Sequence, residues 1–189
     1  AEVIGLDLNA PVTKEQAKFL NQTLLQQIVL VIRDQDLTPK AYCKGVSVFG
    51  KPRLQHRLAF RLSEGPEVSR VINREKMRPA ANWHTDHTNH EEAPKATVLY
   101  ARKLPSNGGD TCFADMYAGL ANLSSESRER ISTLFTTNFM EADNPTYSAG
   151  DRDAFGGGAR HPMVRTHPET GKKALYFHVT KVTGVDDLE

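Results

Sequence analysis

The chain has 189 residues, enough for one domain with a hydrophobic core and too few to argue for two. Lys plus Arg number 24 and Asp plus Glu 23, so the formal net charge is +1 and no global field attracts nucleic acid or an anionic membrane. No apolar run approaches the roughly 20 residues that span a bilayer. The N-terminal stretch also lacks the basic start and apolar core of a signal peptide.

Cysteine usage points to a reducing compartment. Cys43 and Cys112 lie far apart in the sequence and form no CxxC motif. We expect two free thiols in a cytoplasmic protein, and a disulfide between them is the alternative.

The N-terminal third alternates strands and helices. Residues 2–8 predict a strand from their partly alternating polarity. Thr13 and Gln16 have the spacing of a capping box, which predicts a helix beginning there. The β-branched run at 29–33 is typical of a buried strand.

A second helix is expected to follow. Thr38 is its predicted N-cap and Pro39 its first residue, and it would end near Gly50. Residues 68–73 predict a further strand.

The middle of the chain reads as strands around a turn. Residues 96–104 and 111–117 are strand candidates, and the two glycines of 105–110 favour a hairpin-like connection between them. Residues 123–135 predict a helix with Ser124 as its cap.

The C-terminal part begins with a segment rich in Gly, Asp, Asn and Ser at 143–160, which predicts a mobile loop or active-site lid. Residues 161–179 predict two strands joined by a PETGK turn.

The segment with the clearest chemistry is Asn82-Trp83-His84-Thr85-Asp86. Side chains at i and i+2 of an extended chain point to the same side, so His84 and Asp86 offer a nitrogen and an oxygen to one ion. Two histidines and one carboxylate on one face of an octahedron form the facial triad of non-haem iron(II) oxygenases. Taken alone the tripeptide is a weak signal, and a plain surface turn is the alternative.

A zinc site competes locally. His84, His87 and His90 are spaced three apart, which would bring them near one face of a helix. The segment contains four poor helix formers, Asn82, Thr85, Thr88 and Asn89, which argue against that helix.

The surroundings of the HxD motif are more specific. The strings NWHTD, APKATVLYARKLPSNGGDTCFADMY and HPMVRTHPETGKKALYF closely resemble the taurine dioxygenase family (TauD/TfdA) of iron(II)- and 2-oxoglutarate-dependent oxygenases. The earlier AEVIGLDL and VLVIRDQDLTP resemble segments near the start of that family. The likeness runs over most of the chain, in order and at similar spacing.

The resemblance implies a mainly β fold with flanking helices around a double-stranded β-helix, a jelly-roll-like core of the cupin type. It implies Fe(2+) as the metal, with 2-oxoglutarate and dioxygen as cosubstrates. His84 and Asp86 match the first two iron ligands, and Thr111 in GGDT matches the threonine that binds the distal carboxylate of 2-oxoglutarate. The implied reaction hydroxylates a small molecule and releases succinate and carbon dioxide.

Two functional residues of the family have no match in this sequence. They are the third iron ligand, a histidine, and the arginine that binds 2-oxoglutarate; we expect both beyond Glu189. His161, His167 and His178 match other family positions, and Arg165 is expected to be structural. The chain therefore reads as a single oxygenase domain that lacks its C-terminal segment.

The substrate is predicted to be polar or anionic. Residues just after the aspartate line the substrate pocket in relatives, and His87 and Asn89 are polar where the taurine enzyme has apolar residues. His56 lies near a substrate-binding histidine of that enzyme, although an exposed loop residue is the alternative. Trp83 and Tyr100 are expected to be core residues.

Two further functions stay open. One is a non-catalytic or truncated relative that binds a small acid, and the other is a zinc-dependent hydrolase built on the histidine cluster. The expected partner is a small-molecule substrate, and neither nucleic acid nor a membrane is expected to bind. The sequence leaves the oligomeric state open, and a homo-oligomer is one of the alternatives.

Overall fold

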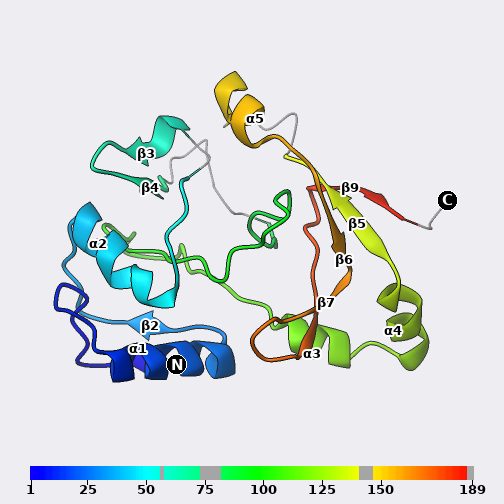
Figure 1. The fold of residues 1–189 in the computed structure, drawn as a ribbon, viewed down its shortest axis with the longest axis horizontal. Helices are drawn as coiled ribbons and strands as arrows, with labels where there is room; N and C mark the ends of the chain where they lie inside the picture. The colour runs from blue at the N-terminus through cyan, green and yellow to red at the C-terminus, as the bar shows by residue number, and fades with distance from the viewer. Residues whose placement is uncertain (56–57, 73–81, 141–146, 187–189) are drawn as a thin grey trace.

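The computed structural model describes residues 1–55, 58–72, 82–140 and 147–186. In Figure 1, α1, α2 and β2–β4 lie on one side of the molecule, and α3, α4, β5–β7 and β9 lie on the other. The green segment that carries the HxD motif runs between these two groups. Among the described helices, none is long and apolar enough to cross a membrane.

The helices and strands are short. The helical elements are α1 (Lys14–Gln27), α2 (Pro39–Val46), η1 (Ser47–Phe49), η2 (Leu58–Phe60), α3 (Met116–Ala121), α4 (Ser125–Ser132) and α5 (Ala149–Phe155). The strands are β1 (Glu2–Val3), β2 (Val31–Ile32), β3 (Arg61–Leu62), β4 (Gly65–Ser69), β5 (Phe135–Asn138), β6 (Ala159–Pro162), β7 (Val164–Thr166), β8 (Lys173–Leu175) and β9 (Val182–Val185).

The strands form four small sheets. β1 pairs with β2 in parallel, and β3 with β4 and β7 with β8 antiparallel. β5 is the central strand of the remaining sheet, between β6 and β9, and both of its pairings are antiparallel. Thr136 of β5 lies opposite His161 of β6 and Val185 of β9.

The three predicted helices, α1, α2 and α4, begin where the sequence places them. Thr13 caps α1 in a capping box, in which its hydroxyl accepts from the Gln16 N–H while the Gln16 side chain accepts from the Thr13 N–H. Thr38 and Ser124 cap α2 and α4 through their hydroxyls, and Pro39 is the first residue of α2. These starts are confirmed because each depends on hydrogen bonds within a few residues.

The apolar core is small. Its buried members come from both sides of the molecule: Leu8, Leu20, Leu37, Val46, Leu134, Met140, Tyr147 and Ala159. Leu8 packs so closely on α2 that a Cβ added at Gly45 would lie 2.7 Å from the Leu8 Cβ. Only glycine fits that approach without displacing Leu8.

The strand predictions are confirmed only in part. The hairpin within 161–179 is present as β7 and β8, with Gly171 at φ +69° in the turn. The strands predicted at 2–8 and 29–33 shrink to two residues each, and Val31 is 40% exposed rather than buried.

Three predicted elements are wrong in kind. Residues 96–104 form no strand, because their backbone pairs with no other strand among the described residues. The strand predicted at 111–117 is irregular as far as Asp115, which caps α3 instead. The predicted loop at 143–160 contains α5 and most of β6 in its described part, and its role as a lid stays a prediction.

The predicted fold class is right only in outline. The described residues form a mixture of helices and small sheets, and no closed β-barrel is found among them. Cys43 and Cys112 are both free thiols, as expected.

Candidate functional site

His84 and Asp86 lie side by side. His84 is in an irregular stretch that leads into a turn at residues 86–89, where the His90 N–H donates to the His87 carbonyl at 3.0 Å. His84 Nε2 is 3.3 Å from Asp86 Oδ1, so the i, i+2 spacing does bring the two side chains together. Both side chains are partly open to solvent, 32% for His84 and 40% for Asp86.

In each side chain, the polar atom that points away from the pair makes a hydrogen bond. His84 Nδ1 is 2.7 Å from the Asn82 carbonyl oxygen, which can only accept, so Nδ1 carries a proton, and in the neutral ring Nε2 would keep its lone pair. The Thr97 hydroxyl donates to Asp86 Oδ2 at 2.8 Å. Nε2 and Oδ1 therefore face each other, and the hydrogen bonds on the opposite atoms are of the kind that orient metal-binding side chains.

The pair fits two adjacent positions of a metal ion. Two ligand atoms about 2.1 Å from one ion and at right angles are about 3 Å apart, close to the 3.3 Å between His84 Nε2 and Asp86 Oδ1. One imidazole and one carboxylate suit ferrous iron. Among the described residues, no group of three His, Cys, Asp or Glu side chains is arranged to hold a metal, so the pair supplies two ligands and not a complete site.

The histidine cluster does not form the alternative zinc site within the described part of the chain. The segment is a turn, with His87 at φ 57°, and the His87 and His90 ring centroids are 5.5 Å apart. Burial lowers the pKa of His87 to about 4, against the opposing charge of Asp86, and the charges of His90, Lys181 and Arg53 lower it further. Burial and the same two cations also lower the pKa of His90.

Asn89 is buried and joins three parts of the fold. Its Oδ1 accepts from Lys181 Nζ at 3.1 Å, and its Nδ2 donates to the Phe155 carbonyl at 3.1 Å. Lys181, 6% exposed, ends a turn at residues 179–181, and His178, just before that turn, packs against His84 with ring centroids 5.7 Å apart. The turn after the HxD motif is thus fixed to α5 and to the segment before β9.

Sequence reasoning missed Thr97 and Lys181. Lys181 is 92 residues from its partner Asn89, and no local pattern indicates that contact. Thr97 is 11 residues from Asp86 and lies in a segment that the sequence predicts to be an ordinary strand.

Among the described residues, Thr111 makes no hydrogen bond to the pair. Thr111 is exposed, in the irregular stretch after Gly108 and Gly109, which both have positive φ. His56 lies outside the described residues. The roles of Thr111, His56, His87 and Asn89 in binding cosubstrate or substrate stay predictions.

The residues predicted to lie in the core or to be structural have different outcomes. Trp83 is 62% exposed, so its assignment to the core is wrong. Tyr100 is half-buried, stacks on Tyr42 with ring centroids 5.9 Å apart, and its hydroxyl donates to the Gln35 carbonyl. Arg165 lies over the Tyr176 ring, 4.9 Å from its centroid, in keeping with a structural role.

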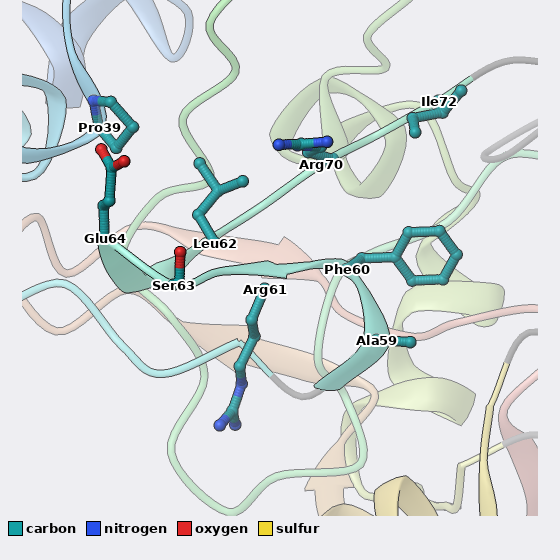
Figure 2. Close-up of a pocket in the computed structure, with 9 residues that line it drawn as sticks. All are labelled: Pro39, Ala59, Phe60, Arg61, Leu62, Ser63, Glu64, Arg70 and Ile72. Atoms are coloured by element: carbon teal, nitrogen blue, oxygen red, sulfur yellow. The ribbon is translucent and has the colours of Figure 1, made fainter.

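A separate cavity of about 490 Å³ lies between η2, β3 and the end of β4. Figure 2 shows Phe60 and Leu62 on one side of it and Arg70 and Ile72 on the other. Its lining includes none of the predicted site residues, so the HxD pair belongs to a different part of the surface.

Comparison with known proteins identifies the family. The family model described as taurine catabolism dioxygenase TauD, TfdA family matches residues 1–189. An alkylsulfatase of Acinetobacter baylyi is 27% identical over 187 residues, which cover 93% of this chain and 58% of that protein. A (S)-phenoxypropionate/alpha-ketoglutarate-dioxygenase of Sphingobium herbicidovorans is 27% identical over 188 residues, which cover 90% of this chain and 65% of that protein.

The fold agrees with the sequence match. The crystal structure of a taurine dioxygenase from Burkholderia xenovorans superposes with a TM-score of 0.79 at 26% identity, over 100% of this chain and 63% of that one. The chain thus spans less than two thirds of the length of each of these relatives. On the match over its whole length, the chain belongs to the TauD/TfdA family of dioxygenases.

Proposed function

We propose that the protein containing this chain is an iron(II)- and 2-oxoglutarate-dependent dioxygenase. It hydroxylates a small organic anion and releases succinate and carbon dioxide. The observation that carries the proposal is the His84–Asp86 pair, whose facing atoms are 3.3 Å apart while the outer atom of each side chain is held by a hydrogen bond. Membership of the TauD/TfdA family supports the reaction type.

The residues of this chain have distinct roles in the proposal. His84 and Asp86 would hold the iron at two positions, and the bound iron would supply the activation of dioxygen. Asp86 would offset part of the metal's charge, and His84, in its neutral form with Nδ1 protonated, would present the Nε2 lone pair to it. Thr111 is proposed to donate a hydrogen bond to the distal carboxylate of 2-oxoglutarate, within a double-stranded β-helix as the complete fold.

An anionic substrate is supported by the charges around the turn after Asp86. Lys181 and Arg53 both lower the pKa of His87 and of His90, so two cations act on this side of the metal pair. A positive field of this kind attracts anions and repels cations. The names of the relatives refer to alkyl sulfates and to (S)-phenoxypropionate, both anionic molecules.

The test uses the full-length protein with iron(II), 2-oxoglutarate and a panel of sulfonates, sulfate esters and aryloxy acids, with succinate and oxidised product measured separately. His84→Ala and Asp86→Ala are expected to lose iron binding and turnover while the fold is kept. Asp36→Ala, which removes an exposed carboxylate elsewhere, is the matched control and should behave as wild type. Full iron-dependent activity in both site variants would refute the proposal. A wild type that binds no iron and consumes no 2-oxoglutarate would instead favour a non-catalytic relative.

A further inference from the structure

We propose that Thr97 is a positioning residue of the metal site, which makes Asp86 bind the ion through a single oxygen. The Thr97 hydroxyl donates to Asp86 Oδ2 at 2.8 Å, while Asp86 Oδ1 faces His84 Nε2. This inference rests on the proposed metal-binding role of His84 and Asp86.

The hydrogen bond decides how the carboxylate can bind. A carboxylate can coordinate a metal through one oxygen or through both. With the Thr97 hydroxyl bonded to Oδ2, Asp86 would present Oδ1 to the ion. A facial arrangement of three protein ligands leaves three open positions, and a second oxygen from Asp86 would take one of them.

Each of the two ligands is oriented by a hydrogen-bond partner outside the pair. The Asn82 carbonyl accepts from His84 Nδ1, and the Thr97 hydroxyl donates to Asp86 Oδ2, so a partner outside the pair fixes the rotation of each side chain. The partner of His84 is a backbone group that no substitution removes. The partner of Asp86 is a side chain, so its contribution can be measured.

Thr97 can act in this way because its segment is anchored on both sides. Before it, Lys95 Nζ donates to Asn21 at 2.8 Å and pairs with Glu169 at 3.0 Å. After it, the Tyr42 hydroxyl donates to the Val98 carbonyl at 2.7 Å, and the Tyr100 hydroxyl accepts from the Leu37 N–H at 2.9 Å. Residues 95–100 are thereby held without a regular strand, and the β-branched Thr97 side chain has few rotamers to choose from.

Exposure to solvent limits how much the loss of the Thr97 hydroxyl weakens metal binding. Asp86 is 40% exposed, so water can replace part of the hydrogen bond when the Thr97 hydroxyl is removed. Loss of a residue that orients a metal ligand typically weakens metal binding by about 10- to 100-fold. We therefore expect the lower end of that range, about tenfold.

The experiment compares Thr97→Val, Thr97→Ser and Thr166→Val in the full-length protein. Valine keeps the shape of threonine without its hydroxyl, and serine keeps the hydroxyl without the methyl group. Thr166 is exposed on β7 and serves as the matched control. The readouts are the dissociation constant of Co(II), an oxygen-stable probe of the iron site, measured by calorimetry, and the visible absorption spectrum of the bound Co(II).

Thr97→Val should weaken Co(II) binding about tenfold and change its spectrum, because Asp86 gains freedom to coordinate through both oxygens. Thr97→Ser should remain close to wild type, and Thr166→Val should be unchanged. Wild-type affinity and spectrum in Thr97→Val would overturn this inference and leave the proposed function standing. An equal loss of Co(II) affinity in Thr97→Ser would also overturn it, because packing of the methyl group would then explain the loss. A wild type that binds neither Co(II) nor iron(II) would overturn the proposed function and this inference together.

Discussion

Asp151 anchors α5 to the opposite side of the molecule, and its replacement by alanine tests that connection. The Asp151 side chain is 1% exposed. Its Oδ2 accepts from the Ser148 N–H and the Ser148 hydroxyl, both at 2.7 Å, and its Oδ1 accepts from the Leu58 N–H at 2.8 Å. The same carboxylate therefore closes the capping box of α5 and ties that helix to η2, 93 residues away in sequence.

The expected cost is large because the lost acceptor is charged and buried. A hydrogen bond to a charged group contributes about 1.5–3 kcal/mol, and a donor left without its acceptor in a buried place adds a desolvation cost. Ser148 and Leu58 are exposed residues that can recover some hydrogen bonding from water, so the losses do not simply add. We expect Asp151→Ala to lower the free energy of unfolding by about 3–5 kcal/mol.

Two further variants separate the contributions. Asp151→Asn keeps an acceptor for the Leu58 N–H but places an amide against the Ser148 N–H, so about 1–3 kcal/mol should be lost. Asp153→Ala removes an exposed carboxylate from the same helix and should change the free energy of unfolding by less than about 0.5 kcal/mol.

Urea unfolding of the full-length protein, followed by far-ultraviolet circular dichroism at fixed metal concentration, measures these differences. For a domain of this size, a loss of 3–5 kcal/mol also corresponds to a fall in Tm of roughly 6–20 °C. If Asp151→Ala were no less stable than Asp153→Ala, the carboxylate would not anchor α5, and the reasoning from its hydrogen bonds would be refuted.

Two predictions concern ligand binding. Thr111→Val should raise the dissociation constant of 2-oxoglutarate by about 10- to 100-fold, because one hydrogen bond to a carboxylate is lost, and titration of the iron-loaded protein measures it; an unchanged constant would remove Thr111 from the site. Lys181→Met removes a buried charge near the metal pair at similar volume, so KM for an anionic substrate should rise by about tenfold or more while KM for 2-oxoglutarate stays at the wild-type value. Equal KM values for the anionic substrate in the variant and wild type would count against the proposed substrate class.

The sequence by itself determined the parts of this protein that depend on close neighbours. The capping residues Thr13, Thr38 and Ser124 mark true helix starts, since each cap accepts from an N–H three residues further along the chain. The hairpin within 161–179 follows equally from a turn between two short strands. His84 and Asp86 come together because only one residue, Thr85, separates them, which is also a local fact.

Only the tertiary structure decided what surrounds that pair. A strand requires a partner, so the apolar pattern of 96–104 could not by itself say that this stretch stays irregular in the described fold. The Thr97 hydrogen bond to Asp86 and the Lys181 hydrogen bond to Asn89 depend on segments that meet in space, and no spacing along the chain encodes those meetings. The burial of Asn89 and the exposure of Trp83 have the same origin, because each is set by which segments happen to cover it.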